Sequence, residues 1–452
     1  MRFTPHTPSD RELMLERIGV RSVEELFSAM PADLKLKKPL DLPPALSEPE
    51  ALAALAGLAR ANSGTSKLVC FAGAGAYDHY IPAVIDTIIS RSEFYTAYTP
   101  YQAEVSQGTL QSIYEFQSLV CRLFEMEVAN ASMYDCATAL AETAHMARDV
   151  TRRNELLVSS GVNPVWTEVV RTYSHGLNIP IRLLPLTTGC TDHSELEQNL
   201  DNDTAAVLIQ HPNFFGSVEP VRKLAGLCHA KGALLVVAVD PVSLGVLAPP
   251  GAYDADVAVA EGQALGIPLS FGGPYLGMMA AKKKLVRNMP GRIVARTADV
   301  DGKTGYVLAL QTREQHIRRE RATSNICTNQ ALCALAAGTY LSLMGRTGLA
   351  EVARQCLAKS HYLATRIGEV PGFSVEPCTE FFKEFVVKTP VPAADVVAAA
   401  AEAGILAGVD LARFNPDWRN RLLVAVTERR TRREMDAYVA LLQKQFGGKR
   451  GL

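Results

Sequence analysis

The sequence has almost no net charge and no long apolar run. Its 452 residues carry 46 Lys plus Arg against 47 Asp plus Glu, a formal net charge of -1. A protein that recruits nucleic acid usually presents a basic field, which this composition lacks. No run of about 18 apolar residues is present, and the charged, proline-containing start lacks the apolar segment of a signal peptide. We therefore expect a cytoplasmic protein that binds neither nucleic acid nor membranes.

The usual fingerprints of metal and nucleotide sites are also missing. The nine cysteines include no CxxC pair, and none of the nine histidines forms an HExxH motif, so we expect no disulfide framework and no metal. The sequence GAGAYD begins like a dinucleotide-binding fingerprint, but Asp78 stands where the third glycine is required. These absences exclude several common enzyme classes.

The length and the 48% hydrophobic content indicate a chain with a large core and more than one domain. Residues 1–62 resemble an N-terminal arm of short helices, with capping signals at Ser9 and Ser22, joined to a proline-rich strap. Residues 63–310 are expected to form a large α/β domain, and residues 311–452 a small α+β domain. The arm could instead be a partly disordered tail.

Short apolar runs separated by helix-length segments define the large domain. They lie at 67–73, 155–160, 181–186, 205–210, 233–240, 257–262 and 275–280. Strands that are apolar along their whole length and alternate with helices are typical of a parallel sheet covered on both faces. The fold class predicted from this pattern is α/β.

One acidic residue stands at the edge of the predicted sheet where α/β proteins bind ligands. Asp240 directly follows the apolar run 233–239. In pyridoxal phosphate (PLP) enzymes such an acid holds the pyridinium nitrogen, and a lysine farther along the chain forms the Schiff base. No lysine occurs between Lys231 and Lys282. Asp240 and the glycine-rich SFGGP at 270–274 indicate a PLP-type large domain, but without that lysine the chain cannot perform PLP chemistry alone.

Two polar regions flank this domain pattern. Residues 77–108 hold five of the fourteen tyrosines, which suits either a binding interface or a tyrosine-lined core seam. Residues 128–148 place small residues before a helix, where backbone N–H groups could hold a phosphate. Because Asp135 would put a negative charge there, close packing of that helix is the favoured interpretation. A long helix over 323–345 is also predicted, with Ser324 or Asn325 as its cap.

The chain resembles the alpha subunits of two-subunit glycine decarboxylases, the P-proteins of the glycine cleavage system. Five ordered segments carry the resemblance: 71–82, 90–111, 130–142, 261–277 and 318–332. One departure is Cys136, which stands where glycine is expected. The resemblance implies the fold type I of PLP enzymes, with a large domain, a smaller C-terminal domain and an N-terminal arm.

The resemblance also implies how the work is divided between subunits. A beta subunit would carry the catalytic lysine, whereas aligning Ile267 and Pro268 with the family motif puts Gln263 at the lysine position of this chain. Paired with beta as α2β2, the enzyme would decarboxylate glycine with PLP as electron sink and pass the aminomethyl group to the lipoamide of the H-protein.

Groups of this chain are then expected to reach the active site of beta. Thr323, Ser324 and Thr328 are candidates for contact with the PLP phosphate in trans. Candidates for the glycine site or the lipoyl channel are Tyr95, Tyr98, Gln102, Glu104 and Ser106. Two other readings stay open: a cofactor-free scaffold that only stabilises its partner, and a self-contained PLP enzyme of another class that uses an unexpected lysine.

Overall fold

A computed structural model describes residues 5–376 and 380–448 of the chain. The chain forms two compact units, Met1–Ser63 and Gly64–Leu452. The first unit contains α1 (Pro8–Ile18), the 3₁₀ helix η1 (Val23–Phe27) and α2 (Glu48–Ala61), and none of these helices has a buried side chain. The domain boundaries predicted at 62/63 and 310/311 stay predictions.

The caps of the first unit differ in part from the sequence signals. Ser22 caps η1 as predicted, through the N–H of Glu25. The prediction that Ser9 caps the first helix is wrong, because Thr7 and Asp10 form the capping box and Pro8 takes the first helical position. Proline favours that position, since its fixed φ is helical and its missing N–H has no helical partner there.

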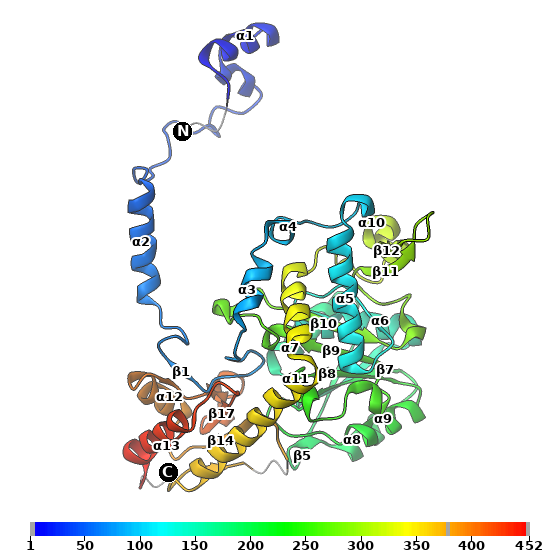
Figure 1. Ribbon diagram of the computed structural model, residues 1–452, viewed down its shortest axis with the longest axis vertical. Helices are drawn as coiled ribbons and strands as arrows, with labels where there is room; N and C mark the ends of the chain where they lie inside the picture. Colours follow the sequence, from blue (N-terminus) through cyan, green and yellow to red (C-terminus); the bar gives the residue numbers. More distant parts are fainter. Residues whose placement is uncertain (1–4, 377–379, 449–452) are drawn as a thin grey trace. The chain divides into compact units, whose positions relative to one another are not determined.

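A seven-stranded sheet forms the centre of the second unit (Figure 1). Its strand order is β2-β10-β9-β8-β7-β3-β4. The bounds are β2 Val128–Ala129, β3 Glu155–Ser159, β4 Ile181–Leu184, β7 Thr204–His211, β8 Leu234–Val239, β9 Val257–Glu261 and β10 Gly277–Ala281. The five strands from β4 to β9 are parallel, and β10 runs antiparallel to β9. This confirms the predicted α/β class.

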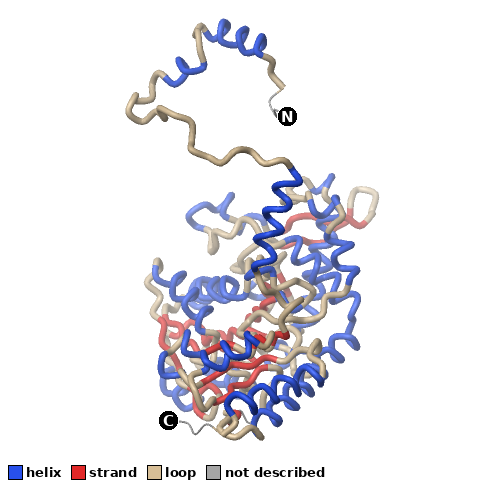
Figure 2. Tube along the Cα trace, turned by 90° about the vertical axis from the view of Figure 1, so that its left-hand side faces the viewer, coloured by secondary structure: helices blue, strands red, loops and turns tan. Residues whose placement is uncertain are grey.

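Helices cover both faces of the sheet, and Figure 2 shows the strands lying between helical segments. Alternate residues of β8 point to opposite faces: Leu235 and Val237 enter one core, and Val236 and Ala238 enter the other. The first face is covered by α5 (Gln107–Phe124), α8 (His193–Asn199), α9 (Val221–Ala230) and the first half of α11 (Ala331–Gly368). The second is covered by α6 (Cys136–Thr151) and α7 (Pro164–His175).

The C-terminal part has a core of its own. Its sheet has the order β13-β14-β17-β16 and packs against the second half of α11. The bounds are β13 Ser374–Val375, β14 Glu384–Lys388, α12 Ala393–Glu402, β15 Ile405–Leu406, β16 Val409–Asp410, β17 Arg421–Ala425 and α13 Arg432–Phe446. Residues 377–379 of the predicted C-terminal α+β domain lie outside the described residues.

Two sequence expectations about single elements are corrected. The apolar run 67–73 does not join the central sheet: its strand β1 (Val69–Cys70) pairs with β15 of the C-terminal part. Helix α11 starts at Ala331, not near Ser324 or Asn325, because residues 322–330 form no regular secondary structure. The packed helix therefore begins where its apolar face begins.

The eight described cysteines are free, and Cys378 lies outside the described part. Among the helices that the structure describes, none combines the length and the apolar character needed to span a bilayer.

Candidate functional site

Polar side chains converge at the carboxyl ends of the parallel strands. Asp240 directly follows β8, Glu261 ends β9, and Gln263 lies in the turn η5 (Gly262–Ala264) that follows. Because β8 and β9 are neighbours, these three positions share one edge of the sheet. The predicted placement of Asp240 at the carboxyl end of a buried parallel strand is therefore confirmed.

Asp240 is paired with a lysine that comes from the C-terminal part of the chain. The Nζ atom of Lys383 lies 2.7 Å from Asp240 Oδ2, 3.1 Å from His79 Nε2 and 3.5 Å from the centre of the Tyr77 ring. Lys383 is 1% exposed, so this cation is removed from water and depends on these partners. The ion pair joins the start of β14 to the end of β8.

Gln263 is held at both ends of its amide group. Its Oε1 accepts from the Tyr77 N–H at 2.8 Å, and its Nε2 donates to the carbonyl oxygens of Tyr77 at 3.1 Å and Ile267 at 2.8 Å. The side chain is 2% exposed. An amide nitrogen cannot form a Schiff base. Here its hydrogen bonds connect the loop at Tyr77 to Ile267.

Tyr77 and Glu384 connect the same loop to the C-terminal sheet. The hydroxyl of Tyr77 donates to Glu384 Oε2 at 2.6 Å, and the Ala74 N–H donates to Glu384 Oε1 at 2.7 Å. Burial raises the pKa of Glu384 to about 7 in spite of these donors. Gly73 is required for this approach, since a Cβ there would lie 2.4 Å from Glu384 Oε1.

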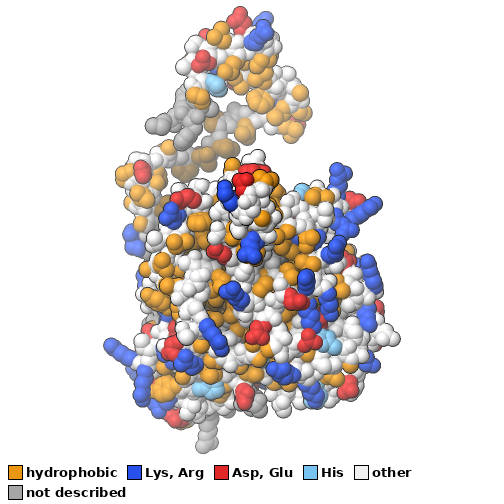
Figure 3. All heavy atoms as spheres, turned by 45° about the vertical axis from the view of Figure 1, so that its right-hand side comes forward, with side chains coloured by type: hydrophobic (Ala, Val, Ile, Leu, Met, Phe, Trp, Pro, Cys, Tyr) orange, Lys and Arg blue, Asp and Glu red, His pale blue; other side chains and the backbone are white. Residues whose placement is uncertain are grey.

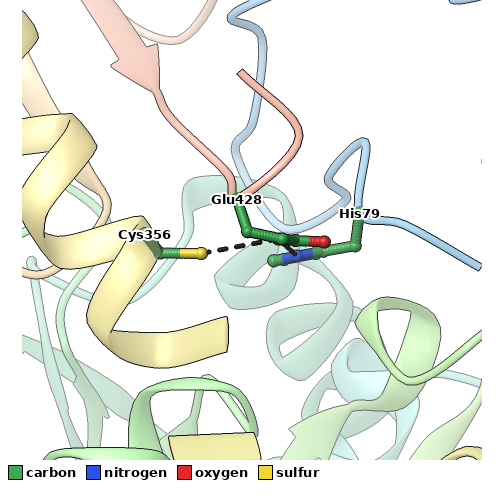
Figure 4. Close-up of side chains that lie close together, drawn as sticks. All are labelled: His79, Cys356 and Glu428. Atoms are coloured by element: carbon green, nitrogen blue, oxygen red, sulfur yellow. Dashed lines mark hydrogen bonds and ion pairs between the residues drawn. The ribbon is translucent and has the colours of Figure 1, made fainter. Parts of the chain in front are cut away.

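The histidine of this loop takes part in a further chain of contacts, drawn in Figure 4. His79 Nε2 can only accept from the Lys383 ammonium, so the ring donates from Nδ1 to Glu428 Oε2 at 2.6 Å. Burial opposes the ionisation of Glu428, but its contact with His79 and the Tyr80 N–H outweigh burial and lower its pKa to about 2.

Figure 4 also shows Cys356 of α11, which a dashed line joins to Glu428. Among the described residues the side chains of His79, Cys356 and Glu428 are the one group close enough to ligate a metal ion together. The geometry favours hydrogen bonding instead: the Cys356 thiol lies 3.6 Å from Glu428 Oε2, and burial raises the pKa of that thiol. A metal needs the thiolate, which such burial disfavours.

The start of α6 is the place where the sequence left a phosphate site open. The Asp135 side chain accepts from the Thr138 N–H at 2.7 Å, and Glu261 Oε2 accepts from the Cys136 N–H at 3.1 Å. Burial raises the pKa of Glu261 to about 8. Cys136 is fully buried at the first position of the helix. Two carboxyl groups of the chain thus occupy these donors, which supports the packing interpretation.

The tyrosines of residues 77–108 divide into one buried and four exposed side chains. Tyr77 is in the core, whereas Tyr95 is 68% and Tyr98 is 78% exposed. Tyr95 and Tyr98 belong to the segment that runs from α4 (Ser92–Tyr95) to the 3₁₀ helix η2 (Ala103–Val105). Gln102 and Glu104 are exposed as well, and Ser106 is half-buried. A core seam is therefore excluded for this segment, which presents its polar and aromatic groups outward.

Arg292 contacts both of the segments that carry predicted site residues. Its Nη2 donates to the Tyr101 hydroxyl at 3.0 Å, and its guanidinium lies 5.3 Å from the centre of that ring. The same nitrogen lies 3.8 Å from the Cys327 sulfur, next to Thr328. Sequence reasoning missed Arg292, which is 6% exposed and follows no motif. The segments 92–106 and 322–330 therefore border one region.

The three candidate phosphate contacts lie in the extended segment before α11. Thr323 donates to Asp149 Oδ2 at 3.0 Å. Ser324 hydrogen-bonds Glu142. Burial raises the pKa of Glu142 to about 7, although the hydrogen bond to Ser324 acts in the opposite direction. The hydroxyl groups of Thr323 and Ser324 are thus hydrogen-bonded to residues of α6, whereas Thr328 is exposed. The helix N–H groups expected beside Thr323 and Ser324 lie elsewhere, because α11 starts at Ala331.

Comparison with known proteins identifies the family. Residues 1–442 match the family described as the glycine cleavage system P-protein. The chain belongs to this P-protein family. A probable glycine dehydrogenase (decarboxylating) subunit 1 from Desulforamulus reducens is 52% identical over 442 residues, which cover 98% of this chain and 99% of that protein. This P-protein chain is accordingly a component of an oxidoreductase-class enzyme.

Solved structures agree with the P-protein assignment. The crystal structure of an inhibitor-bound glycine decarboxylase (P-protein) of the glycine cleavage system superposes with a TM-score of 0.90 at 42% identity, and covers 98% of this chain and all of that one. A C-DES mutant with glycine covalently linked to its PLP cofactor has a TM-score of 0.62 at 16% identity, over 85% of this chain and 98% of that one. The predicted fold type I of PLP enzymes is thereby confirmed.

In this P-protein the least predictable site residue is Lys383. It lies in the C-terminal part, outside the window in which a Schiff-base lysine was sought, and no motif surrounds it. One signal was present in the sequence: Lys383 and Glu384 are charged residues that directly precede the apolar residues 385–387. Buried charges in such a position require partners.

Proposed function

We propose that this chain is the alpha subunit of a cytoplasmic two-subunit glycine decarboxylase, in which a beta subunit holds PLP. The observation that carries the proposal is Gln263, which aligns with the lysine of the family motif and whose amide is hydrogen-bonded on both sides. Family membership and the name of the relative from Desulforamulus reducens, a subunit 1, support a division of labour between two subunits.

The assembled α2β2 enzyme would act on glycine and on the lipoamide of the H-protein. Glycine loses its carboxyl group as CO₂, and the remaining aminomethyl group passes to the lipoamide disulfide, which is reduced as it accepts the group. PLP held by beta supplies the electron sink for the loss of CO₂. The role of the alpha chain is to present groups to that site.

Two surface segments are proposed for this role. Tyr95, Tyr98, Gln102, Glu104 and Ser106 would line the glycine site or the lipoyl channel. Tyrosine suits a surface that must be apolar for a lipoyl arm and polar for glycine, since its ring and hydroxyl serve both. Figure 3 shows one face of the molecule on which hydrophobic, basic and acidic side chains are interspersed rather than sorted by charge.

Thr323, Ser324 and Thr328 are proposed as contacts of the PLP phosphate of beta. The three residues differ in whether their hydroxyl groups are already bonded within this chain. Thr328 is exposed, whereas the hydroxyls of Thr323 and Ser324 are already bonded to Asp149 and Glu142. We therefore expect Thr328→Val to weaken PLP binding in the complex, and Thr323→Val to act mainly by loosening the segment.

The first experiment records the visible absorbance of the chain with PLP, before and after borohydride, alone and co-expressed with beta. We expect a reducible band only with beta, and peptide mapping should place the reduced lysine in beta. A reducible band that maps to this chain would instead favour a self-contained PLP enzyme.

A second experiment separates an active-site role from a scaffold role. Tyr98→Ala in the complex is expected to lower turnover at least tenfold while assembly, measured by sedimentation, stays intact. Val105→Ala, an equally exposed neighbour in the same segment, is the matched control. Unchanged turnover in Tyr98→Ala, Tyr95→Ala and Thr328→Val would favour the cofactor-free scaffold.

A further inference from the structure

A fold type I enzyme needs three groups to hold PLP, and the residues of this chain do not fit the cofactor at any of the three. The aldehyde needs a lysine, the pyridinium nitrogen needs a free carboxylate, and the phosphate needs free N–H donors. Here each position is filled by side chains of the chain itself. The mismatch goes beyond a missing lysine.

The carboxylate position is occupied by a cation. Lys383 Nζ lies 2.7 Å from Asp240 Oδ2 and stands over the face of Tyr77 at 3.5 Å. A carboxylate that accepts from this ammonium, and also from the Val242 N–H at 3.0 Å, has no unsatisfied charge to offer a pyridinium. The Tyr77 ring lies beside the ammonium, where an aromatic ring also stabilises a cation.

The space that remains beside Asp240 is small. A cavity of about 20 Å³ is lined by Tyr77, Trp166, Asp240 and Glu261, among others. This volume holds about one water molecule, whereas pockets for small organic ligands measure about 300 Å³ or more. A pyridine ring cannot enter without displacing Tyr77 and Lys383, both of which are buried.

The two other positions are filled in the same way. Gln263 stands at the lysine position with both amide atoms bonded to the Tyr77 loop. The first N–H groups of α6, the donors that a phosphate could use, are bonded to Asp135 and Glu261. A phosphate would have to displace two carboxyl groups from these donors, and Asp135 would repel it.

We propose that the Lys383 ammonium is a built-in replacement for the positive charge of the cofactor, which closes this pocket to PLP and fastens the C-terminal sheet to the edge of the central sheet. Restoring a lysine at position 263 would therefore not create a PLP site. This inference concerns the pocket of this chain alone and holds whether or not beta carries the reaction.

The test uses the full chain in four forms: wild type, Gln263→Lys, Gln263→Lys with Lys383→Ala, and Gln263→Lys with Lys388→Ala. Lys388 ends the same strand and is exposed, so the last form is the matched control. Each is incubated with micromolar PLP, reduced with borohydride and mapped by peptide mass spectrometry. Labelling at position 263 is expected only in the form that lacks Lys383.

A second readout does not depend on a covalent bond. Pyridoxine 5′-phosphate has no aldehyde, and Trp166 lines the residual cavity, so quenching of its fluorescence reports entry of the ring. The other tryptophan is replaced by Trp418→Phe in all forms. We expect at least tenfold tighter binding in the form without Lys383 than in Gln263→Lys.

The outcomes are distinct. Labelling at 263 in Gln263→Lys alone, or saturable quenching of Trp166 in the wild type at micromolar ligand, would overturn the proposal. A folded Lys383→Ala form that binds no more tightly than Gln263→Lys would overturn the assignment of Lys383 as the barrier. If that form fails to fold, the wild type and Gln263→Lys still decide, because both keep the ion pair intact.

Discussion

Removal of the Lys383 charge should destabilise the chain far more than its small volume change suggests. Lys383→Met keeps an unbranched stem of similar length but leaves Asp240, whose side chain is 13% exposed, without its cation. Breaking one side of a buried ion pair costs about 3–5 kcal/mol, because the remaining charge stays buried and uncompensated. His79 Nε2 also loses its donor, which places the expected loss in the upper part of that range.

Urea unfolding measures this loss. With a slope of about 3 kcal/mol per M of urea, a loss of about 3–5 kcal/mol lowers the midpoint by about 1–1.7 M. Lys388→Met, at the exposed end of the same strand, is the control and should stay within about 0.5 kcal/mol of the wild type.

A double-mutant cycle tests whether the loss belongs to the pair. Asp240→Asn removes the partner charge but keeps an oxygen for the Val242 N–H. Lys383→Met combined with Asp240→Asn should therefore be more stable than the sum of the two single losses predicts, by at least about 2 kcal/mol. Additive effects, or a loss below about 1 kcal/mol in Lys383→Met, would refute the reasoning that a buried, mutually dependent pair closes the pocket.

Three further predictions concern the surroundings of the pocket. The pKa of Glu428 is lowered from 4.5 to about 2, so this carboxylate stabilises the fold above its unfolded pKa and loses the effect as the pH falls toward 2. The difference in the free energy of unfolding between wild type and Glu428→Gln should therefore be roughly 3 kcal/mol at pH 7 and vanish near pH 2. Gly73→Ala, whose Cβ would lie 2.4 Å from a buried carboxylate oxygen, should cost about 1–3 kcal/mol in urea unfolding, whereas Gly108→Ala, with nothing within 4 Å, should cost none. Arg292→Met should speed chymotrypsin cleavage within residues 92–106 severalfold, because the tether to Tyr101 is lost; an unchanged rate would argue against that tether.

The central sheet could be predicted because its strands are apolar along their whole length. Six of the seven apolar runs became strands of that sheet. Five of them run parallel, as the pattern predicted, whereas β10 runs antiparallel to β9, and the described residues 262–276 between these two strands form no α-helix. The run 67–73 carries the same local signal but pairs with β15. Its partner strand lies near the other end of the chain, and no local pattern reports such a pairing. Tertiary contacts decided where this strand went.

The candidate site was predictable only where a residue's place on the sheet dictates its role. Asp240 follows a buried parallel strand, so its position at the ligand edge followed from the fold class. The start of α11 was misplaced, because Ser324 carries a cap signal that is used instead to bind Glu142. Arg292 and Lys383 are isolated residues whose partners are distant in sequence, so spacing says nothing about them.

The pocket at Asp240 is filled by side chains of the chain itself, and this explains why the polar groups that are still available lie on the surface. An acid left at the edge of the sheet without its cofactor would be a buried, uncompensated charge, and only a cation from the chain itself can offset it permanently. Lys383 does so from the C-terminal sheet, and the loop 72–81 is drawn in with it through Tyr77 and His79. Asp240, Gln263 and the N–H groups of Cys136 and Thr138 are then all bonded within the chain. Tyr95, Tyr98 and Thr328 are exposed instead, so we expect any contribution of this chain to catalysis to come from them and to be made to another chain.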